Sequence, residues 1–136
     1  MILLDTNVLS AMMRAQDNPV VIDWIDRHSS SLWISSVTIY EIRYGIALLP
    51  PGRRASALLD DFGTAIANFG GNILDFDAEA AALLGARRKA AGSNIGLADT
   101  QIAGIAISCD ATVATRNVKD FAIAGCAVLN PFVPQA

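Results

Sequence analysis

The sequence predicts an α/β fold with a mainly parallel sheet that helices cover on both faces. The main reason is an alternation along the whole chain between short apolar segments, typical of buried strands, and longer segments with helical periodicity. Composition agrees, because 53% of the residues are hydrophobic and 17% are charged, which excludes a disordered chain. A length of 136 residues is typical of one domain, expected to cover residues 1–136.

The expected strands are short apolar runs. They are Ile2–Leu4, Leu32–Ser35, Asn72–Phe76, Thr112–Thr115 and Ala127–Leu129. Runs of this kind, without regular alternation of polar and apolar residues, are typical of strands buried on both faces. A central sheet of about five strands follows.

Helical patterns fill the segments between these strands. The expected helices cover residues 7–13, 19–27, a segment that ends before Pro50, 55–69, 78–91 and 97–108. The third carries apolar residues at positions i, i+3, i+7 and i+10, which are Ile39, Ile42, Ile46 and Leu49. Asp77 is expected to cap the helix at 78–91.

Three acids adjoin apolar runs in this weakly charged chain: Asp5, Glu41 and Asp99. Asp5 follows the first expected strand, and residues 115–117 follow a later one. Ligands of parallel sheets bind beyond the carboxyl ends of the strands. Glu41 and Asp99 are expected in first turns of helices that begin at the same edge. If these side chains converge, their oxygen atoms suit a hard cation such as Mg²⁺ or Mn²⁺.

Each acid also has a purely structural interpretation as a helix cap. Asp5 could cap the following helix, and Thr38 with Glu41 matches a capping box. Asp99 in a first turn would be favoured by the helix dipole by roughly 0.3–1 kcal/mol. Caps do not explain why several such positions adjoin apolar runs at one edge of the sheet, whereas a bound cation does.

Other polar positions near these acids have two interpretations as well. Asn117 could cap a helix with Asp120 as its partner three residues on. Arg43 and Arg116 each adjoin a candidate acid, so they could pair with it or contact a phosphate.

Charge and composition exclude several classes of protein. A net charge of −3 with a pI near 4.9 argues against binding nucleic acid by bulk electrostatics. The single His28 disfavours a histidine-rich metal site and a Ser-His-Asp mechanism. Cys109 and Cys126 lack metal-type spacing, so we expect reduced, buried thiols and a cytoplasmic protein. No membrane association is expected, because no apolar run reaches the roughly 18 residues that span a bilayer.

At these residues the chain resembles the PIN-domain family, and within it the ribonuclease toxins of VapBC-type bacterial toxin–antitoxin pairs. Four segments carry the resemblance in the family's order: LLDTNVL at 3–9, TIYEIRYG at 38–45, LADTQIA at 97–103 and VATRNVKDF at 113–121. The resemblance implies a three-layer α/β/α fold and an endoribonuclease that uses one or two Mg²⁺ or Mn²⁺ ions. It also implies a homodimer and a cognate VapB-type antitoxin that inhibits the RNA-cleaving site.

The resemblance also assigns roles to residues. Asp5, Glu41 and Asp99 would form the acidic triad that holds the metal. Three neighbours, Thr6, Asn7 and Thr115, would orient these ligands.

The fourth acidic position is ambiguous in this chain. Some relatives carry an aspartate where this sequence has Asn117, and Asp120 lies one helical turn further on. Arg116, and with it Arg43, would contact the RNA phosphate.

Several apolar residues exceed what a small core needs, and an amphipathic antitoxin segment is expected in a groove between their helices. They are Trp24, Ile46, Leu49, Leu58, Leu59 and Phe62.

Functions from other classes fit the sequence less well or stay open. A phosphoacceptor receiver or an Asp-x-Asp phosphatase is disfavoured, because Asp5 is followed by Thr6 and Asn7 rather than by a second acid. A catalytically weak or silent PIN-fold interaction module stays open, with Asn117 as a sign of lost catalysis. A DNA-directed nuclease of the same fold stays open too.

Overall fold

Five parallel strands form the centre of the structure, a computed structural model that describes residues 1–91 and 95–135. The strands are β1 (Ile2–Leu4), β2 (Leu32–Ser35), β3 (Ile73–Leu74), β4 (Thr112–Ala114) and β5 (Val128–Leu129). Their order is β3-β2-β1-β4-β5, and every neighbouring pair is parallel. The predicted parallel sheet is confirmed, although its three C-terminal strands are shorter than expected.

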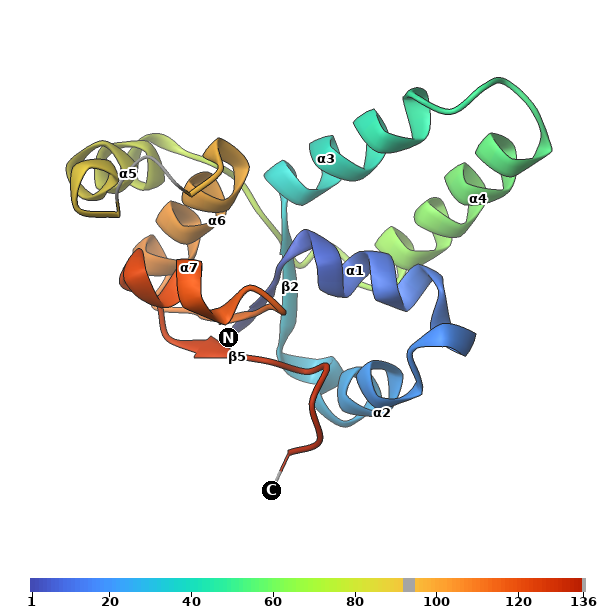
Figure 1. The fold of residues 1–136 in the computed structure, drawn as a ribbon, viewed down its shortest axis with the longest axis horizontal. Coiled ribbons are helices and arrows are strands. Elements are labelled where there is room, and N and C mark those ends of the chain that lie inside the picture. Colours follow the sequence, from blue (N-terminus) through green and yellow to red (C-terminus); the bar gives the residue numbers. More distant parts are fainter. Residues whose placement is uncertain (92–94, 136) are drawn as a thin grey trace.

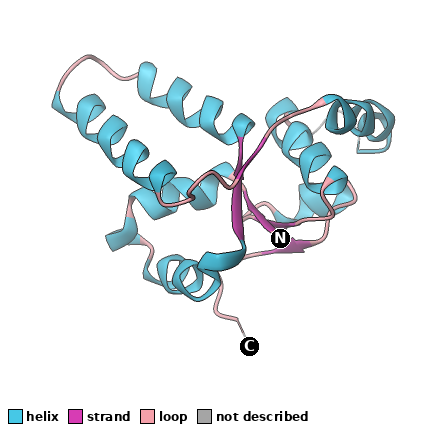
Figure 2. Cartoon of the chain, turned by 180° about the vertical axis from the view of Figure 1, so that it is seen from behind, coloured by secondary structure: helices cyan, strands magenta, loops and turns pink. Residues whose placement is uncertain are grey.

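Helices cover the sheet on both faces within the described residues. They are α1 (Thr6–Met13), α2 (Pro19–His28), α3 (Ser36–Ala47), α4 (Arg53–Ala67), α5 (Ala78–Ala91), α6 (Leu97–Ser108) and α7 (Val118–Ile123). Helices α1 to α4 lie on one side of the sheet and α5 to α7 on the other (Figure 1). The view from behind shows the same three layers (Figure 2). The three-layer α/β/α architecture is therefore confirmed.

Strand residues alternate between two apolar cores. Leu4 and Ile34 pack with α1 to α4, whereas Leu3 and Val113 pack with α5 and α6, and all four are fully buried. A strand with helices on both faces must be apolar at successive positions. This requirement explains why the strands appear in the sequence as continuous apolar runs.

Helix α3 begins earlier than the sequence suggested. Ser35 is its N-cap, and the Ser35 hydroxyl accepts a hydrogen bond from the Thr38 backbone N–H at 3.1 Å. Glu41 therefore lies in the second turn of α3, so its assignment to a first turn, and to a capping box with Thr38, is wrong. By contrast, Asp77 caps α5 as predicted, because its carboxylate accepts from the Ala80 N–H at 2.9 Å.

Part of the apolar surface expected from the sequence is buried. Trp24 is 1% exposed and Phe62 is 4% exposed, so both belong to the core beneath α1 to α4. Cys109 and Cys126 are free thiols, as expected, but they are only partly buried. None of the helices in the described ranges is long and apolar enough to cross a membrane.

Candidate functional site

The carboxyl ends of β1 and β4 bring together two residues that are far apart in the sequence. The Asp5 backbone N–H donates to the Ala114 carbonyl at 2.9 Å and extends the pairing of the two strands. The Thr115 hydroxyl then donates to Asp5 Oδ2 at 2.8 Å. Asp5 is 3% exposed, so the strand pairing places a carboxylate at a nearly closed position on the sheet edge.

The residues that follow Asp5 fix the orientation of its side chain. Asp5 Oδ1 accepts from the Thr6 backbone N–H at 2.7 Å, which also caps α1. Asp5 Oδ2 accepts from the Asn7 side-chain amide at 3.1 Å. The Asn7 side-chain oxygen, Oδ1, in turn accepts from the Arg116 backbone N–H at 3.3 Å. Asn7 thereby links the loop after β1 to the loop after β4.

A chain of hydroxyl groups holds Glu41. The Ser35 hydroxyl donates to Thr38 Oγ1 at 3.3 Å, and Thr38 Oγ1 lies 3.0 Å from Thr6 Oγ1. The Thr6 hydroxyl donates to Glu41 Oε1 at 2.6 Å. Because each hydroxyl has one proton, this order makes Thr38 the donor to Thr6. The series of hydroxyl groups ends at Glu41 Oε1, which accepts from Thr6, and the other carboxylate oxygen, Oε2, is left available.

Asn117 joins two further carboxylates. Its side-chain nitrogen donates to Asp120 Oδ2 at 2.9 Å and to Asp99 Oδ2 at 3.3 Å. Its backbone N–H donates to the Thr115 hydroxyl at 2.8 Å, although its side chain does not cap α7. Asn117 and Asp120 therefore both reach the site. The amide lies between the two acids as a neutral donor.

Burial and mutual repulsion perturb the acids. The pKa of Asp5 is raised from 3.8 to about 6, mainly by burial and in part by the nearby charges of Asp99 and Glu41, while the hydrogen bonds from Thr115 and Thr6 act to lower it. Burial also raises the pKa of Asp99, with the charges of Glu41 and Asp120 as additional causes. Acids that repel one another in this way form a site of concentrated negative charge, which a cation would relieve.

The family of the chain is clear from its sequence. Residues 2–125 match the PIN domain. The chain is 42% identical to the plasmid stability protein StbB of Pseudomonas syringae pv. tomato, over 97% of this chain and 99% of that protein. The chain belongs to the PIN-domain family.

Two other relatives of this PIN domain are named for activities. The VapC ribonuclease Y4jK of Sinorhizobium fredii is 37% identical over 98% of this chain and 99% of its own length. The toxin FitB of Neisseria gonorrhoeae is 39% identical over 97% of this chain and 99% of its own length. The structure of FitAB bound to the IR36 DNA fragment contains a chain that superposes on 100% of this PIN domain and 99% of itself, with a TM-score of 0.89 and 38% identity.

The donor set of this PIN domain fits a hard divalent cation. Within residues 1–91 and 95–135, no three acidic, histidine or cysteine side chains lie close enough to surround one ion. Mg²⁺ does not require such a cage, because it keeps several waters and binds through one or two carboxylates together with substrate phosphate. The carboxylates of Asp5, Glu41 and Asp99 are the oxygen ligands that such an ion prefers.

The two candidate arginines lie differently. Arg116 directly follows Thr115, and its guanidinium lies over the Phe132 ring at 3.9 Å from the ring centroid rather than in an ion pair with Asp5, Glu41 or Asp99. Arg43 lies on the exposed side of α3. Two helical positions correspond to a rotation of about 200°, so Arg43 points away from Glu41 and is not brought into the site.

Sequence reasoning missed two side chains that support Glu41. Ser35 and Thr38 are fully buried and belong to the hydroxyl chain that ends at Glu41. Thr38 drew attention only as a possible cap. The available signal was a polar residue, Ser35, directly at the end of a buried strand, which is the position that Asp5 also occupies.

Proposed function

We propose that this PIN domain is a metal-dependent endoribonuclease that acts in the cytoplasm as the toxin of a type II toxin–antitoxin pair. The observation that carries the proposal is the convergence of Asp5, Glu41 and Asp99 at the carboxyl edge of the sheet, where burial, with their mutual charges as a further cause, raises the pKa values of Asp5 and Asp99. The relatives named VapC ribonuclease and toxin FitB support the activity and the biological role.

Asp5, Glu41 and Asp99 would hold one or two Mg²⁺ or Mn²⁺ ions. A bound ion would lower the pKa of a water that attacks the RNA phosphodiester and would stabilise the charge that develops on the phosphate. Thr6 and Thr115 keep the Glu41 and Asp5 oxygens in fixed positions through their hydroxyl hydrogen bonds. Arg116, which directly follows Thr115, would contact the phosphate.

Asp120 and Asn117 would share the fourth position. Asp120 supplies the negative charge that Asn117 lacks, and the Asn117 amide orients both Asp120 and Asp99 by donating to each. Removing the Asn117 amide would leave two neighbouring carboxylates without their common donor.

The test is cleavage of total RNA by the purified chain with Mg²⁺, with Mn²⁺ and with EDTA. Asp5→Asn and Asp99→Asn should abolish cleavage without unfolding the chain, and EDTA should abolish it as well. Asp60→Asn, which changes an exposed acid on α4, is the matched control and should cleave normally. Normal cleavage by a well-folded Asp5→Asn variant would refute the assignment.

We also propose that a VapB-type antitoxin binds this chain and that the active form is a homodimer. FitAB and the VapBC of Salmonella typhimurium have structures in which they are bound to DNA. A chain of that VapBC structure superposes on 96% of this chain and 97% of itself, with a TM-score of 0.80 and 28% identity. Ile46, Leu49 and Leu58 line a groove between α1, α3 and α4 that an amphipathic segment would fit.

The product of the neighbouring gene should be co-purified with the chain and should suppress its cleavage of RNA. If the chain does not bind this product in a pull-down, it is not the toxin of that pair.

A silent interaction module is the second candidate, and Asn117 is the observation that favours it, because it places a neutral side chain at an acidic position. Binding of Mn²⁺ by a chain that cleaves neither RNA nor DNA would support this candidate. Cleavage of DNA alone would identify a DNA-directed nuclease.

A further inference from the structure

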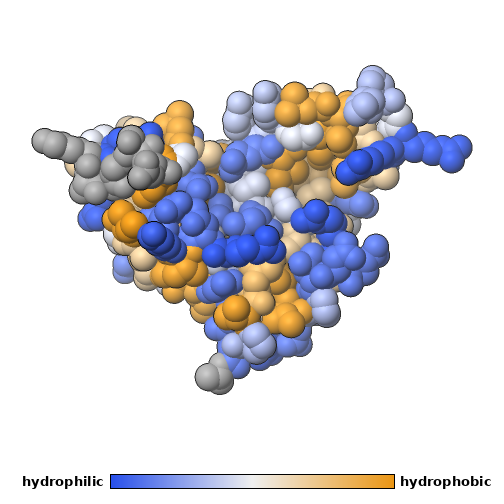
Figure 3. Space-filling model, in the orientation of Figure 1, coloured by the Kyte–Doolittle hydropathy of each residue, from blue (hydrophilic) through white to orange (hydrophobic). Residues whose placement is uncertain are grey.

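The segment that follows β5 starts next to the acidic site. The Thr115 backbone N–H donates to the Leu129 carbonyl at 2.9 Å, which extends the pairing of β4 with β5 as far as the residue that donates to Asp5. The chain then runs down the face seen in Figure 1. Figure 3 shows hydrophobic residues in that region, below hydrophilic residues gathered at the centre of the face.

Hydrogen bonds and packing give this C-terminal segment a defined shape. The Asn130 side-chain oxygen accepts from the Phe132 backbone N–H at 2.9 Å, and the Asn130 carbonyl accepts from the Gln135 side-chain amide at 2.9 Å. Pro131 is buried, and the Phe132 ring packs against the core beneath α1 to α4. The turn and the core together hold the Phe132 ring in place.

Arg116 contacts the face of this ring. Its guanidinium carbon lies 3.9 Å from the Phe132 ring centroid, within the range of a cation–π contact. Among residues 1–91 and 95–135, the exposed Arg116 side chain forms no ion pair and donates no hydrogen bond. The ring supplies no acceptor atom, so the guanidinium N–H groups remain available to a ligand.

Both ends of Arg116 are therefore held. Its backbone N–H donates to Asn7 Oδ1 at 3.3 Å, and the Asn7 amide donates to Asp5 at 3.1 Å. Its side chain is held at the other end by Phe132. The first contact ties Arg116 to the acidic site, and the second fixes the direction of its charge.

We propose that Phe132 is a positioning residue that holds the Arg116 guanidinium ready for the RNA phosphate. The proposal rests on the nuclease function and adds a residue that lies beyond residues 2–125, the part that matches the PIN domain. An exposed arginine loses conformational entropy when a ligand orders it. A side chain that a ring already orders loses less of it, so phosphate binds more tightly.

Contact with the ring is compatible with contact to phosphate. A guanidinium binds phosphate through the N–H groups at its edge, and it contacts an aromatic ring through its face. Arg116 can therefore keep its contact with Phe132 while its N–H groups reach the substrate. The cation–π contact is then present both before and after the RNA binds.

The test combines kinetics with NMR of the Arg116 side chain. Phe132→Leu and Phe132→Met remove the ring but keep an apolar side chain, whereas Phe132→Tyr keeps the ring. Val133→Ala, at the next and exposed position of the segment, is the matched control. Each variant is also combined with Arg116→Gln.

Two quantities are measured for every variant that folds. The kinetic substrate is a short RNA that spans a site which the unmodified chain cuts in total RNA. The NMR signal is the Nε–Hε group of Arg116 in the metal-free chain, assigned by its absence from Arg116→Gln.

We expect Phe132→Leu and Phe132→Met to raise KM by about two- to fivefold with kcat unchanged, as for the loss of an exposed cation–π contact. Arg116→Gln should raise KM by about tenfold. Adding Phe132→Leu to Arg116→Gln should raise KM no further, because the ring acts through Arg116. Phe132→Tyr and Val133→Ala should match the unmodified chain.

The NMR signal checks the contact without any cleavage. The ring current should shift Arg116 Hε upfield in the unmodified chain and in Phe132→Tyr. The shift should disappear in Phe132→Leu and Phe132→Met. An unmodified chain without this shift would show that the ring does not hold Arg116, and the proposal would be wrong.

The kinetic outcomes that overturn the proposal differ from failure of the nuclease function. If Phe132→Leu raises KM equally in the Arg116→Gln background, the ring supports the fold and not Arg116. If the ring-current shift is lost without a rise in KM, the contact exists but does not serve the substrate. In both cases cleavage still requires Asp5, so the nuclease function stands. If the unmodified chain cuts no RNA, that function fails, and the role of Phe132 fails with it.

Discussion

The Asp5 carboxylate is costly to bury in the metal-free chain, because it is 3% exposed and adds to the charge of two neighbouring acids. Its pKa of about 6 lies above 3.8, so the folded chain binds this proton more tightly than the unfolded chain. The resulting stabilisation is complete below pH 3.8 and is lost as the pH rises through about 6. The loss is on the order of 3 kcal/mol, at 1.36 kcal/mol for each pKa unit.

Metal binding should show the opposite dependence on pH. A cation requires the ionised carboxylate, so the affinity for Mn²⁺ should rise by up to tenfold per pH unit until about pH 6 and then level off. Denaturant unfolding at pH 5 and pH 7.5, with and without Mn²⁺, measures both effects. Mn²⁺ should stabilise the chain more at pH 7.5, and equal stabilisation at the two pH values would contradict the assignment of Asp5.

Thr38 provides a second residue-scale prediction, because its hydroxyl is the middle of the chain from Ser35 to Glu41. Thr38→Val keeps the shape but leaves the Ser35 proton and the Thr6 lone pair without a partner, at a cost of about 1–3 kcal/mol. Cleavage and Mn²⁺ affinity should both fall, because Thr6 is then free to turn away from Glu41. Denaturant unfolding and calorimetry with Mn²⁺ measure the two effects.

Two controls separate positioning from general stability. Thr38→Ser restores the hydroxyl and should recover Mn²⁺ affinity, whereas Thr64→Val, on the exposed side of α4, should change neither quantity. A Thr38→Val chain with unchanged Mn²⁺ affinity would show that the hydroxyl chain does not position Glu41.

Asp5 and Thr38 also show which parts of the site could be predicted from the sequence. Asp5 could be identified because an acid that ends an apolar strand is unusual on its own. The spacing of Thr38 and Glu41 predicts a capping box, but the cap is Ser35, and the hydroxyl partner of Thr38 is Thr6, 32 positions away. Contacts between segments that are distant in the sequence determine the role of a residue such as Thr38, and the local spacing of residues does not reveal these contacts.

At the scale of elements, the ends of a strand could be predicted from the sequence where the strand is buried inside the sheet. The strands β1 and β2 match their expected ranges, because each pairs on both sides and every residue in them except the terminal Ser35 is apolar. Strand β3 covers two residues instead of the expected five, because it lies at the edge of the sheet and pairs with β2 alone. The length of an edge strand depends on how far it pairs with the adjacent strand, and the local amino-acid composition does not contain this information.

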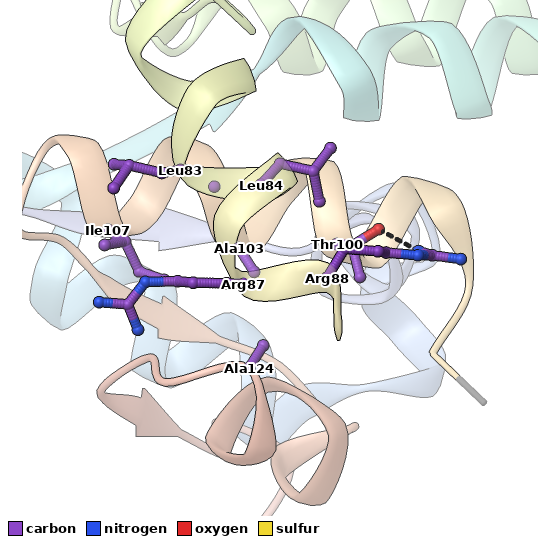
Figure 4. Close-up of a pocket in the computed structure, with 9 residues that line it drawn as sticks. Leu83, Leu84, Arg87, Arg88, Thr100, Ala103, Ile107 and Ala124 are labelled. Atoms are coloured by element: carbon purple, nitrogen blue, oxygen red, sulfur yellow. Dashed lines mark hydrogen bonds between the residues drawn. The ribbon is translucent and has the colours of Figure 1, made fainter. Parts of the chain in front are cut away.

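The turn between α7 and β5 gives the prediction at this scale. Gly125 has a φ of +98°, and an added Cβ would lie 2.5 Å from the Arg87 guanidinium. Figure 4 shows Arg87 extending from α5 between Ile107 and Ala124, the residue before this glycine. Gly125→Ala should therefore destabilise the chain by about 1–2 kcal/mol from the backbone alone. The clash adds a smaller cost, because the guanidinium is the flexible end of the Arg87 side chain.

A double variant separates these two costs in denaturant unfolding. Arg87→Ala removes the clash but not the strained backbone, so Gly125→Ala should cost less in that background. Gly63→Ala, in the middle of α4 with open space around the added Cβ, is the control and should not destabilise. An equal cost of Gly125→Ala in both backgrounds would show that Arg87 moves aside freely.

At the scale of the whole molecule, the site depends on the order of the strands. The sequence indicated that Asp5 and residues 115–117 end strands of one sheet, but not that β1 and β4 are neighbours. That adjacency brings the Thr115 hydroxyl to Asp5 across 110 positions of sequence. The resemblance to a family supplied what the pattern of residues lacked, because it carried the arrangement of the strands with it.

The assembly of the molecule provides the last prediction. Tyr40 and Tyr44 on α3 and Leu48 at its C-cap follow one another at four-residue spacing and are 65%, 55% and 68% exposed. They form one apolar stripe that the described part of the chain leaves open. We expect the homodimer to bury this stripe, since adjoining apolar surface of this kind marks an interface.

Light scattering should find a dimer for the unmodified chain and a monomer for Tyr44→Ser combined with Leu48→Ser. Val20→Ser, which alters an isolated exposed residue on α2, should remain dimeric. A stripe variant that stays dimeric would place the interface on another face, and its RNA cleavage would then show whether the stripe serves the substrate instead.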